Sequence, residues 1–109
     1  MDVKSMLASR LGELGRIIEL CTVSYSLVNG RLRIYYVKVP VKRVRRRLRA
    51  LDLEEAVFEV ADRLGFKYVV SKVTGGGRKY YLIKDLKTYK LLANRNVRLR
   101  RGPGGKPHS

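Results

Sequence analysis

The stretch IIELCTVSYSLVNGRLRIYYVKV, residues 17–39, decides the fold. It is rich in β-branched and aromatic residues, which favour strands, and Asn29-Gly30 divides it. Asn-Gly is the strongest short signal for a two-residue type I′ turn, because both central positions of that turn need a positive φ. The sequence therefore predicts an antiparallel hairpin with strands over residues 17–28 and 31–39.

A two-residue loop fixes the register of this hairpin, beginning with Val28 opposite Arg31. Continuing the pairing places Ser24 opposite Tyr35 and leaves one face apolar, with Leu27 opposite Leu32. The other face carries hydroxyl groups and arginines, and its members are Ser24, Ser26, Arg31, Arg33 and Tyr35. We expect a half-buried sheet with its polar, positively charged face in water.

The elements on both sides of this hairpin are predicted from the spacing of apolar residues and from residues that typically begin or end helices. Apolar residues at helical spacing predict a helix over residues 3–14, with Gly15 as its stop. After Pro40, residues 41–50 have helical spacing, and Asp52 with Glu55 forms a capping-box pattern that starts another helix. A second hairpin is expected over 67–73 and 78–84, and a helix capped by Asp85 over 85–94.

The order of these elements is helix, hairpin, helical segment, hairpin, helix (αββαββα). It predicts an α+β fold in which a four-stranded antiparallel sheet carries helices on one face. Residues 1–94 are expected to form a single domain. Residues 95–109 contain five basic residues, no acids and a Gly-Pro-Gly-Gly run, so a flexible basic tail is expected there.

Charge limits the function of the chain more than its length does. The 109 residues include 25 Lys+Arg and 9 Asp+Glu, for a net charge of +16. Such a surface attracts polyanions, and we expect nucleic acid rather than a membrane, since no stretch is apolar enough to span one. We expect an intracellular protein associated with nucleic acid, because no leader is recognisable. The composition is compatible with a thermophilic source.

Two scarce residue types exclude several kinds of site. Cys21 is the only cysteine and His108 the only histidine. An internal disulfide, a zinc site of several cysteines and a Ser-His-Asp triad are therefore ruled out. No cofactor is expected.

Small residues interrupt the first predicted helix in the stretch LASRLGELG, residues 7–15. Leu7, Ala8, Leu11 and Gly15 match the first, second, fifth and closing letters of a nine-letter motif, and Arg16-Ile17 follows as the motif's pattern does. Through these letters the chain resembles the LAGLIDADG homing-endonuclease family. The likeness extends over residues 3–94, including LEEAVFEVADRLGFKYVVSK (53–72) and RKYYLIKDLKTYKLLA (78–93).

The resemblance implies a homodimer in which the motif helices of two copies pack closely. Small residues permit such an approach, and the implied interface consists of Ala8, Ser9, Leu11, Gly12 and Gly15. The same small residues would also suit a single helix that crosses its own sheet closely. In the family the sheet saddles the DNA major groove, and alternate strand residues read bases.

One departure from the family motif concerns catalysis. The family's metal-binding acid precedes the closing glycine, and here that position is Leu14. Glu13 is one residue early, about 100° around a helix. Phosphodiester cleavage at such a site needs a cation to polarise the phosphate and activate water. We therefore expect DNA binding without cleavage, and no catalytic or metal-binding residue. The alternative is an active nuclease that uses Glu13.

Binding residues are also predicted from the residues themselves. A two-stranded ribbon fits the DNA major groove, where arginine can hold guanine O6 and N7. Lys72 and Arg78 are expected to add to this face from the second hairpin. The basic run after Pro40, through Lys42, Arg43 and Arg46, is expected to hold phosphates; the alternative for all these cations is a solvated surface. The prediction is a homodimer that binds double-stranded DNA, with regulation as one role that fits. The alternative is an RNA-binding, ribosome-associated or RNA-splicing protein.

Overall fold

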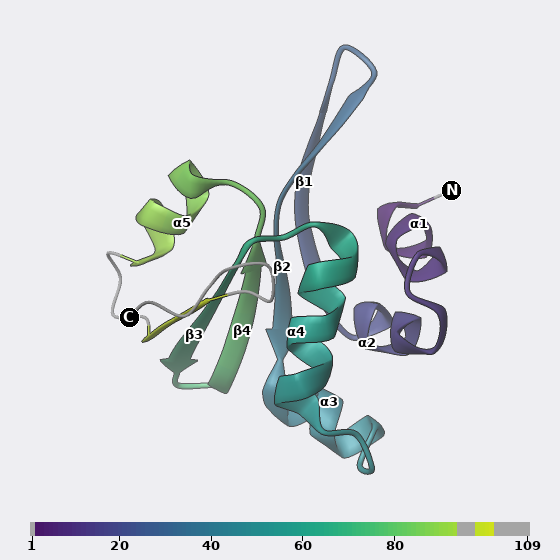
Figure 1. The fold of residues 1–109 in the computed structure, drawn as a ribbon, viewed down its shortest axis with the longest axis vertical. Coiled ribbons are helices and arrows are strands. Elements are labelled where there is room, and N and C mark those ends of the chain that lie inside the picture. The colour runs from purple at the N-terminus through teal and green to yellow at the C-terminus, as the bar shows by residue number, and fades with distance from the viewer. Residues whose placement is uncertain (1, 94–97, 102–109) are drawn as a thin grey trace.

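The computed structural model describes residues 2–93 and 98–101. Its strands form one antiparallel sheet in the order β1-β2-β4-β3-β5 (Figure 1). The strands are β1 (Thr22–Val28), β2 (Arg31–Pro40), β3 (Tyr68–Thr74), β4 (Gly77–Ile83) and β5 (Arg98–Arg101). The helices are α1 (Val3–Ser9), α2 (Gly15–Glu19), α3 (Val41–Arg47), α4 (Leu53–Leu64) and α5 (Leu86–Ala93), with a 3₁₀ turn over Gly12–Leu14.

The first hairpin has the predicted turn, with φ of 51° at Asn29 and 76° at Gly30. Its register is as predicted from Val28–Arg31 to the pair of Tyr25 with Ile34. A bulge between Ser24 and Tyr25 then shifts the pairing, so Ser24 lies opposite Tyr36 and the predicted Ser24–Tyr35 pair is wrong. The bulge inserts one extra residue into β2 and reverses the alternation of side chains beyond it.

The amino-terminal prediction of one helix over 3–14 and a strand from residue 17 is also wrong. The first helix ends at Ser9, and Gly12 adopts a φ of 59°, which redirects the chain. Gly15 does not end a helix but begins α2. Ile17 and Ile18 are buried in the core from this short helix, so β1 begins only at Thr22.

The local capping signals are confirmed. The Asp52 carboxylate accepts a hydrogen bond from the Glu55 N–H at 3.3 Å at the start of α4, and Gly65 ends that helix with a φ of 78°. At the start of α5, the Asp85 carboxylate accepts from the Thr88 N–H at 2.8 Å. Thr74 pairs with Gly77, so Gly75 and Gly76 form the second hairpin turn.

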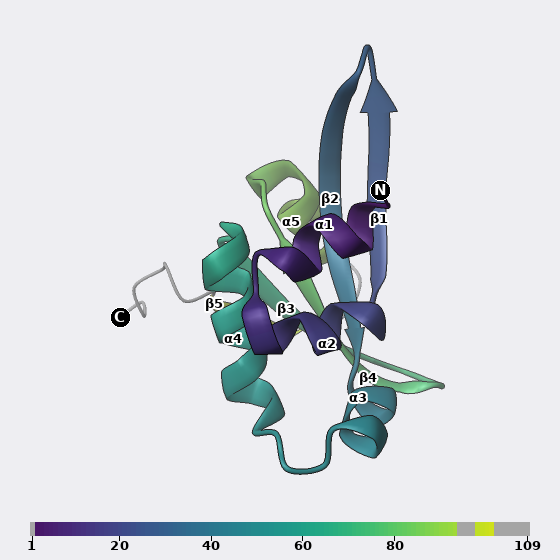
Figure 2. The ribbon, with the colours of Figure 1, turned by 90° about the vertical axis from the view of Figure 1, so that its right-hand side faces the viewer.

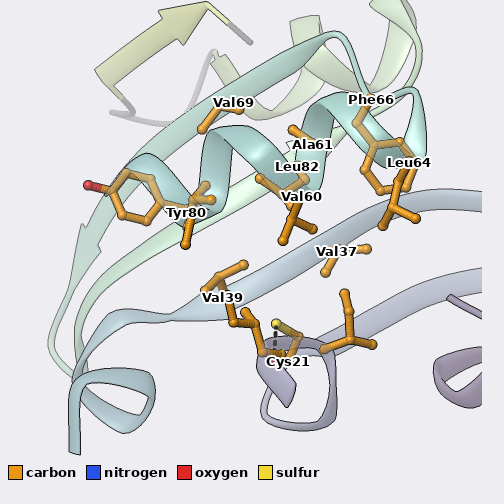
Figure 3. Packing of buried hydrophobic residues seen from close by; sticks show 14 of the residues in the cluster. Cys21, Val37, Val39, Val60, Ala61, Leu64, Phe66, Val69, Tyr80 and Leu82 are labelled. Carbon is orange, nitrogen blue, oxygen red and sulfur yellow. Dashed lines mark hydrogen bonds between the residues drawn. The ribbon is translucent and has the colours of Figure 1, made fainter. Parts of the chain in front are cut away.

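Helices cover both faces of the sheet, so the expectation of helices on one face is wrong. The larger core lies between one face and α1, α2, α3 and α4, and includes Val37, Val39 and Leu82 (Figure 3). The smaller core lies on the opposite face, where Tyr89 of α5 packs with Tyr68. The cause is the run Tyr80–Ile83, which is buried throughout: its alternate side chains point to opposite faces, and both need cover.

Four strands and their antiparallel pairing are as predicted, and β5 adds a fifth. This strand pairs with β3 and comes from the segment predicted to be a flexible tail over 95–109. The rest of that predicted tail, residues 95–97 and 102–109, lies outside the described residues.

The first hairpin extends well beyond the helices that cover its base (Figures 1 and 2). We call residues 25–34, its distal half, the arm. Three apolar side chains of the arm are strongly exposed: Leu27 at 66%, Val28 at 60% and Tyr25 at 47%. The apolar face predicted to be buried is therefore buried only near the base of the hairpin.

Candidate nucleic-acid interface

Polar and basic side chains gather on the sheet face opposite α1, α2 and α4. Strand alternation and the register place eight residues on this side, which we call the basic sheet face: Ser24, Ser26, Arg31, Arg33, Tyr35, Lys38, Lys72 and Lys79. All five residues predicted from the first hairpin belong to it. Lys72, predicted from the second hairpin, lies directly opposite Lys79.

Lys38 and Lys79 escaped prediction for different reasons. In an unbroken hairpin, Lys38 would share the face of Tyr36 and Ile34, away from Arg33. The bulge reverses this parity, and Lys38 lies opposite Tyr81 on the basic sheet face. The three consecutive glycines at the second turn leave the register of the second hairpin open, so the sequence does not show on which face Lys79 lies. Its positive charge alone could have marked it as a candidate for binding a polyanion.

Arg33 contacts two neighbouring side chains and still reaches solvent. Its guanidinium lies 3.8 Å from the Asp85 carboxylate, with 63% of the Arg33 side chain exposed. The guanidinium carbon lies 5.4 Å from the centroid of the Tyr35 ring, and the Tyr35 hydroxyl is 3.0 Å from Ser26 Oγ. An exposed ion pair at this distance is weak, so Arg33 is oriented without being neutralised.

The Asp85 carboxylate joins the arm to α5. A hydrogen bond from the Thr88 backbone N–H lowers the pKa of Asp85 most, and the nearby Arg33 guanidinium lowers it further. Asp85 therefore stays ionised at neutral pH, and the same carboxylate both caps α5 and faces Arg33.

Acidic residues are segregated from the basic sheet face. None of the nine Asp and Glu residues lies in β1, β2, β3 or β4, and Asp85 is the only one beside this face. Five lie on α4 and its cap, at Asp52, Glu54, Glu55, Glu59 and Asp62, and three on the amino-terminal segment, at Asp2, Glu13 and Glu19. The basic sheet face therefore has one carboxylate beside it, whereas the helix-covered side carries the other carboxylates together with the cations of α3.

The predicted phosphate-holding residues lie on α3. Lys42, Arg43 and Arg46 are exposed, while Val41 and Val44 anchor the helix in the larger core. The helix lies at the opposite end of β2 from the arm (Figure 1). Next to it, a shallow hollow is lined by Arg16 of α2 and by Arg47 and Arg49.

Arg78 does not join the basic sheet face, and its predicted place there is wrong. It pairs with Val73 near the tip of the second hairpin, which puts its side chain on the helix-covered face. Its guanidinium donates a hydrogen bond of 2.6 Å to the hydroxyl of Ser71, a buried residue. Arg78 thus satisfies a buried polar group within the fold.

The small residues of the predicted dimer interface serve a contact within the chain. A Cβ at Gly15 would lie 2.7 Å from the Ala8 carbonyl oxygen and 3.1 Å from its Cβ, so α2 packs closely on α1. Leu11 is fully buried in the larger core, while Ser9 and Gly12 are exposed. The resemblance implied a seam between two chains here, and this conformation leaves Leu11 and Gly15 no surface to offer a second copy.

The described residues that the sequence links to cleavage do not form a catalytic or metal-binding cluster. Leu14 is half-buried and packs against the larger core, and Glu13 is exposed. Within residues 2–93 and 98–101, no three His, Cys, Asp or Glu side chains gather at a position that could hold a metal ion. Burial raises the pKa of the Cys21 thiol to about 12, so this thiol is not a nucleophile.

Comparisons of the chain with models of protein families, with curated proteins and with solved structures found no match. The resemblance of residues 7–17 to the LAGLIDADG motif therefore stays a hypothesis. No helix in the described part of the chain is long and apolar enough to cross a membrane.

Proposed function

We propose that the protein binds double-stranded DNA through the basic sheet face, with the arm as the element that enters the major groove. The observation that supports this most is the arrangement of Arg31 and Arg33 on one side of a projecting two-stranded ribbon. A ribbon of this kind fits the major groove, and exposed arginine side chains can donate to guanine O6 and N7. Ser24 and Ser26, on the same side, can donate to or accept from base edges.

The cations of α3 have a different role in this proposal. Nine residue steps separate Arg31 from Pro40 in β2, a span of about 30 Å at strand spacing. The arm and α3 would therefore contact a duplex at separate places. We assign Lys42, Arg43 and Arg46 to the phosphate backbone, where contacts set affinity and salt dependence rather than sequence preference.

Titration of a fluorescently labelled duplex, followed by anisotropy at several salt concentrations, tests this function. We expect the logarithm of the binding constant to fall linearly with the logarithm of salt, with a slope near −0.9 for each phosphate neutralised. An RNA duplex of the same sequence should compete less well than unlabelled DNA. RNA competing better than DNA would favour the RNA-binding alternative, and no binding to either would contradict nucleic-acid binding altogether.

The proposal is binding without cleavage. Leu14 occupies the position where the resembled family carries its metal-binding acid, and it packs in the core rather than lining a polar site. Supercoiled plasmid carrying a selected binding site should stay intact with Mg²⁺ or Mn²⁺, and DNA binding should survive EDTA. Nicking that disappears in Glu13→Gln would show an active nuclease instead.

A further inference from the structure

The two edges of the sheet have opposite chemistry. The β5 edge has the sequence RLRR, so three of its four residues are arginines. The β1 edge has the sequence TVSYSLV, seven residues with no charge and no proline, while β2, β3 and β4 each carry cations. Natural sheets protect free edges with charges, prolines or very short strands. The β5 edge shows such protection and the β1 edge lacks it.

We infer that β1 is the interface with a second copy of this chain, paired antiparallel about a two-fold axis at Tyr25. The sequence of β1 is nearly symmetric about this residue. Self-pairing places Ser24 opposite Ser26, Val23 opposite Leu27, and Tyr25 opposite itself. In these central pairs each side chain meets one of similar chemistry, and such cross-strand pairs stabilise a sheet; only the end pair, Thr22 with Val28, differs in polarity. A two-fold interface uses the same surface on both copies.

Backbone geometry supports the same centre. The type I′ turn makes Val28–Arg31 a hydrogen-bonded pair. Alternation of bonded and non-bonded positions then directs the N–H and C=O groups of Leu27 and Tyr25 away from β2, to the outer side of the sheet. In the proposed pairing, Tyr25 bonds to Tyr25 of the second copy and Leu27 to its Val23.

Exposure and charge favour a copy of this chain as the occupant. Leu27 is 66% exposed, and pairing would set it beside Val23, which packs on the larger core. At a net charge of +16, two copies repel each other, and a neutral contact surface adds the least like-charge repulsion at close range. Of the described strands, β1 is the one without charge. In the dimer the two first hairpins would form one four-stranded sheet, whose joined basic sheet faces would lie across a duplex, whereas a single copy presents the arm as a two-stranded ribbon. The proposed pairing depends on the chemistry of the β1 edge alone, so it stands even if the ligand of the basic sheet face is not DNA.

Sedimentation equilibrium of the full chain, in salt high enough to screen repulsion, tests the pairing. We expect the wild type to dimerise and Leu27→Lys to raise the dimer dissociation constant by about tenfold or more, because a charge enters the neutral seam. Val73→Lys is the matched control, since Val73 is 63% exposed on β3, away from the β1 edge. Its dissociation constant should equal that of the wild type. A monomeric wild type, or equal effects of the two lysines, would overturn the inference.

Cross-linking tests the register. Cα atoms of a bonded antiparallel pair lie about 5.5 Å apart, so a short bismaleimide should join Tyr25→Cys to its own copy and give a covalent dimer on a denaturing gel. Native Cys21 is buried and does not compete. Val73→Cys should remain monomeric on the same gel. Cross-linking of both variants, or of neither, would overturn the proposed seam and leave any dimer to another surface.

Discussion

The two hairpins of the sheet are built from similar strand sequences but end in different environments. The strands of the second hairpin are covered by α4 on one face and α5 on the other, and its residues Tyr80–Ile83 are buried throughout. The first hairpin is covered at its base only, so Leu27 and Val28 of the arm reach solvent. The first hairpin is therefore free to bind a partner, whereas the second holds the fold together.

The largest expected difference between the hairpins is in folding stability. Leu82→Ala removes a fully buried side chain from β4 and should lower the free energy of unfolding by about 2–5 kcal/mol. Leu27→Ala, its counterpart on the arm, should change it by about 0.5 kcal/mol or less when the protein is dilute enough to be monomeric. Chemical denaturation of both variants measures the contrast. Equal losses would mean that the arm is packed as firmly as the second hairpin.

The next effect concerns sequence preference. Arg33→Ala should lower the preference for a selected site over random duplex by about 1–3 kcal/mol if the contact to guanine is bidentate. Arg46→Ala is the control: it should weaken both duplexes alike and reduce the salt slope by about one phosphate. If Arg33→Ala also weakens both duplexes alike, the arm holds phosphates and does not read bases.

A smaller effect is expected at Asp85, which joins the arm to the second hairpin's helix α5. Asp85→Asn keeps a helix-capping side chain and releases Arg33 from its ion pair, so DNA should bind slightly more tightly while α5 remains folded.

The pKa of Asp85 is lowered in the folded state. Its stabilising effect is therefore present above the unfolded pKa, near 3.8, and lost as the pH falls through the folded value. Asp85→Asn should remove that part of the acid sensitivity, which unfolding curves across acidic pH would detect.

Local signals in the sequence were enough for several elements. The Asn29-Gly30 turn, the Asp52 and Asp85 caps and the Gly65 helix end each depend on a few neighbouring residues, and the structure has all of them. Such features are set by backbone conformation and short-range hydrogen bonds.

Predictions that depended on distant contacts failed. The local sequence predicts Gly15 as a helix stop, but its role is set by close packing on Ala8. The side of the sheet occupied by α5 depends on both faces of β4 being apolar. The face on which Lys38 lies depends on a bulge in β2, which the alternation of polar and apolar residues in the sequence does not reveal. The five polar residues predicted from the first hairpin still share one face, because the bulge lies at their inner end.

Arm function is tested most directly by a charge-matched pair of double variants. Arg31→Ala with Arg33→Ala removes two cations from the arm, and Arg10→Ala with Lys67→Ala removes two exposed cations that lie outside both the basic sheet face and α3. Both changes lower the net charge equally, so long-range attraction falls alike. We predict that anisotropy titration with a selected duplex shows a much larger loss of affinity for the arm variant. Equal losses in the two variants would contradict the arm as the DNA-binding element.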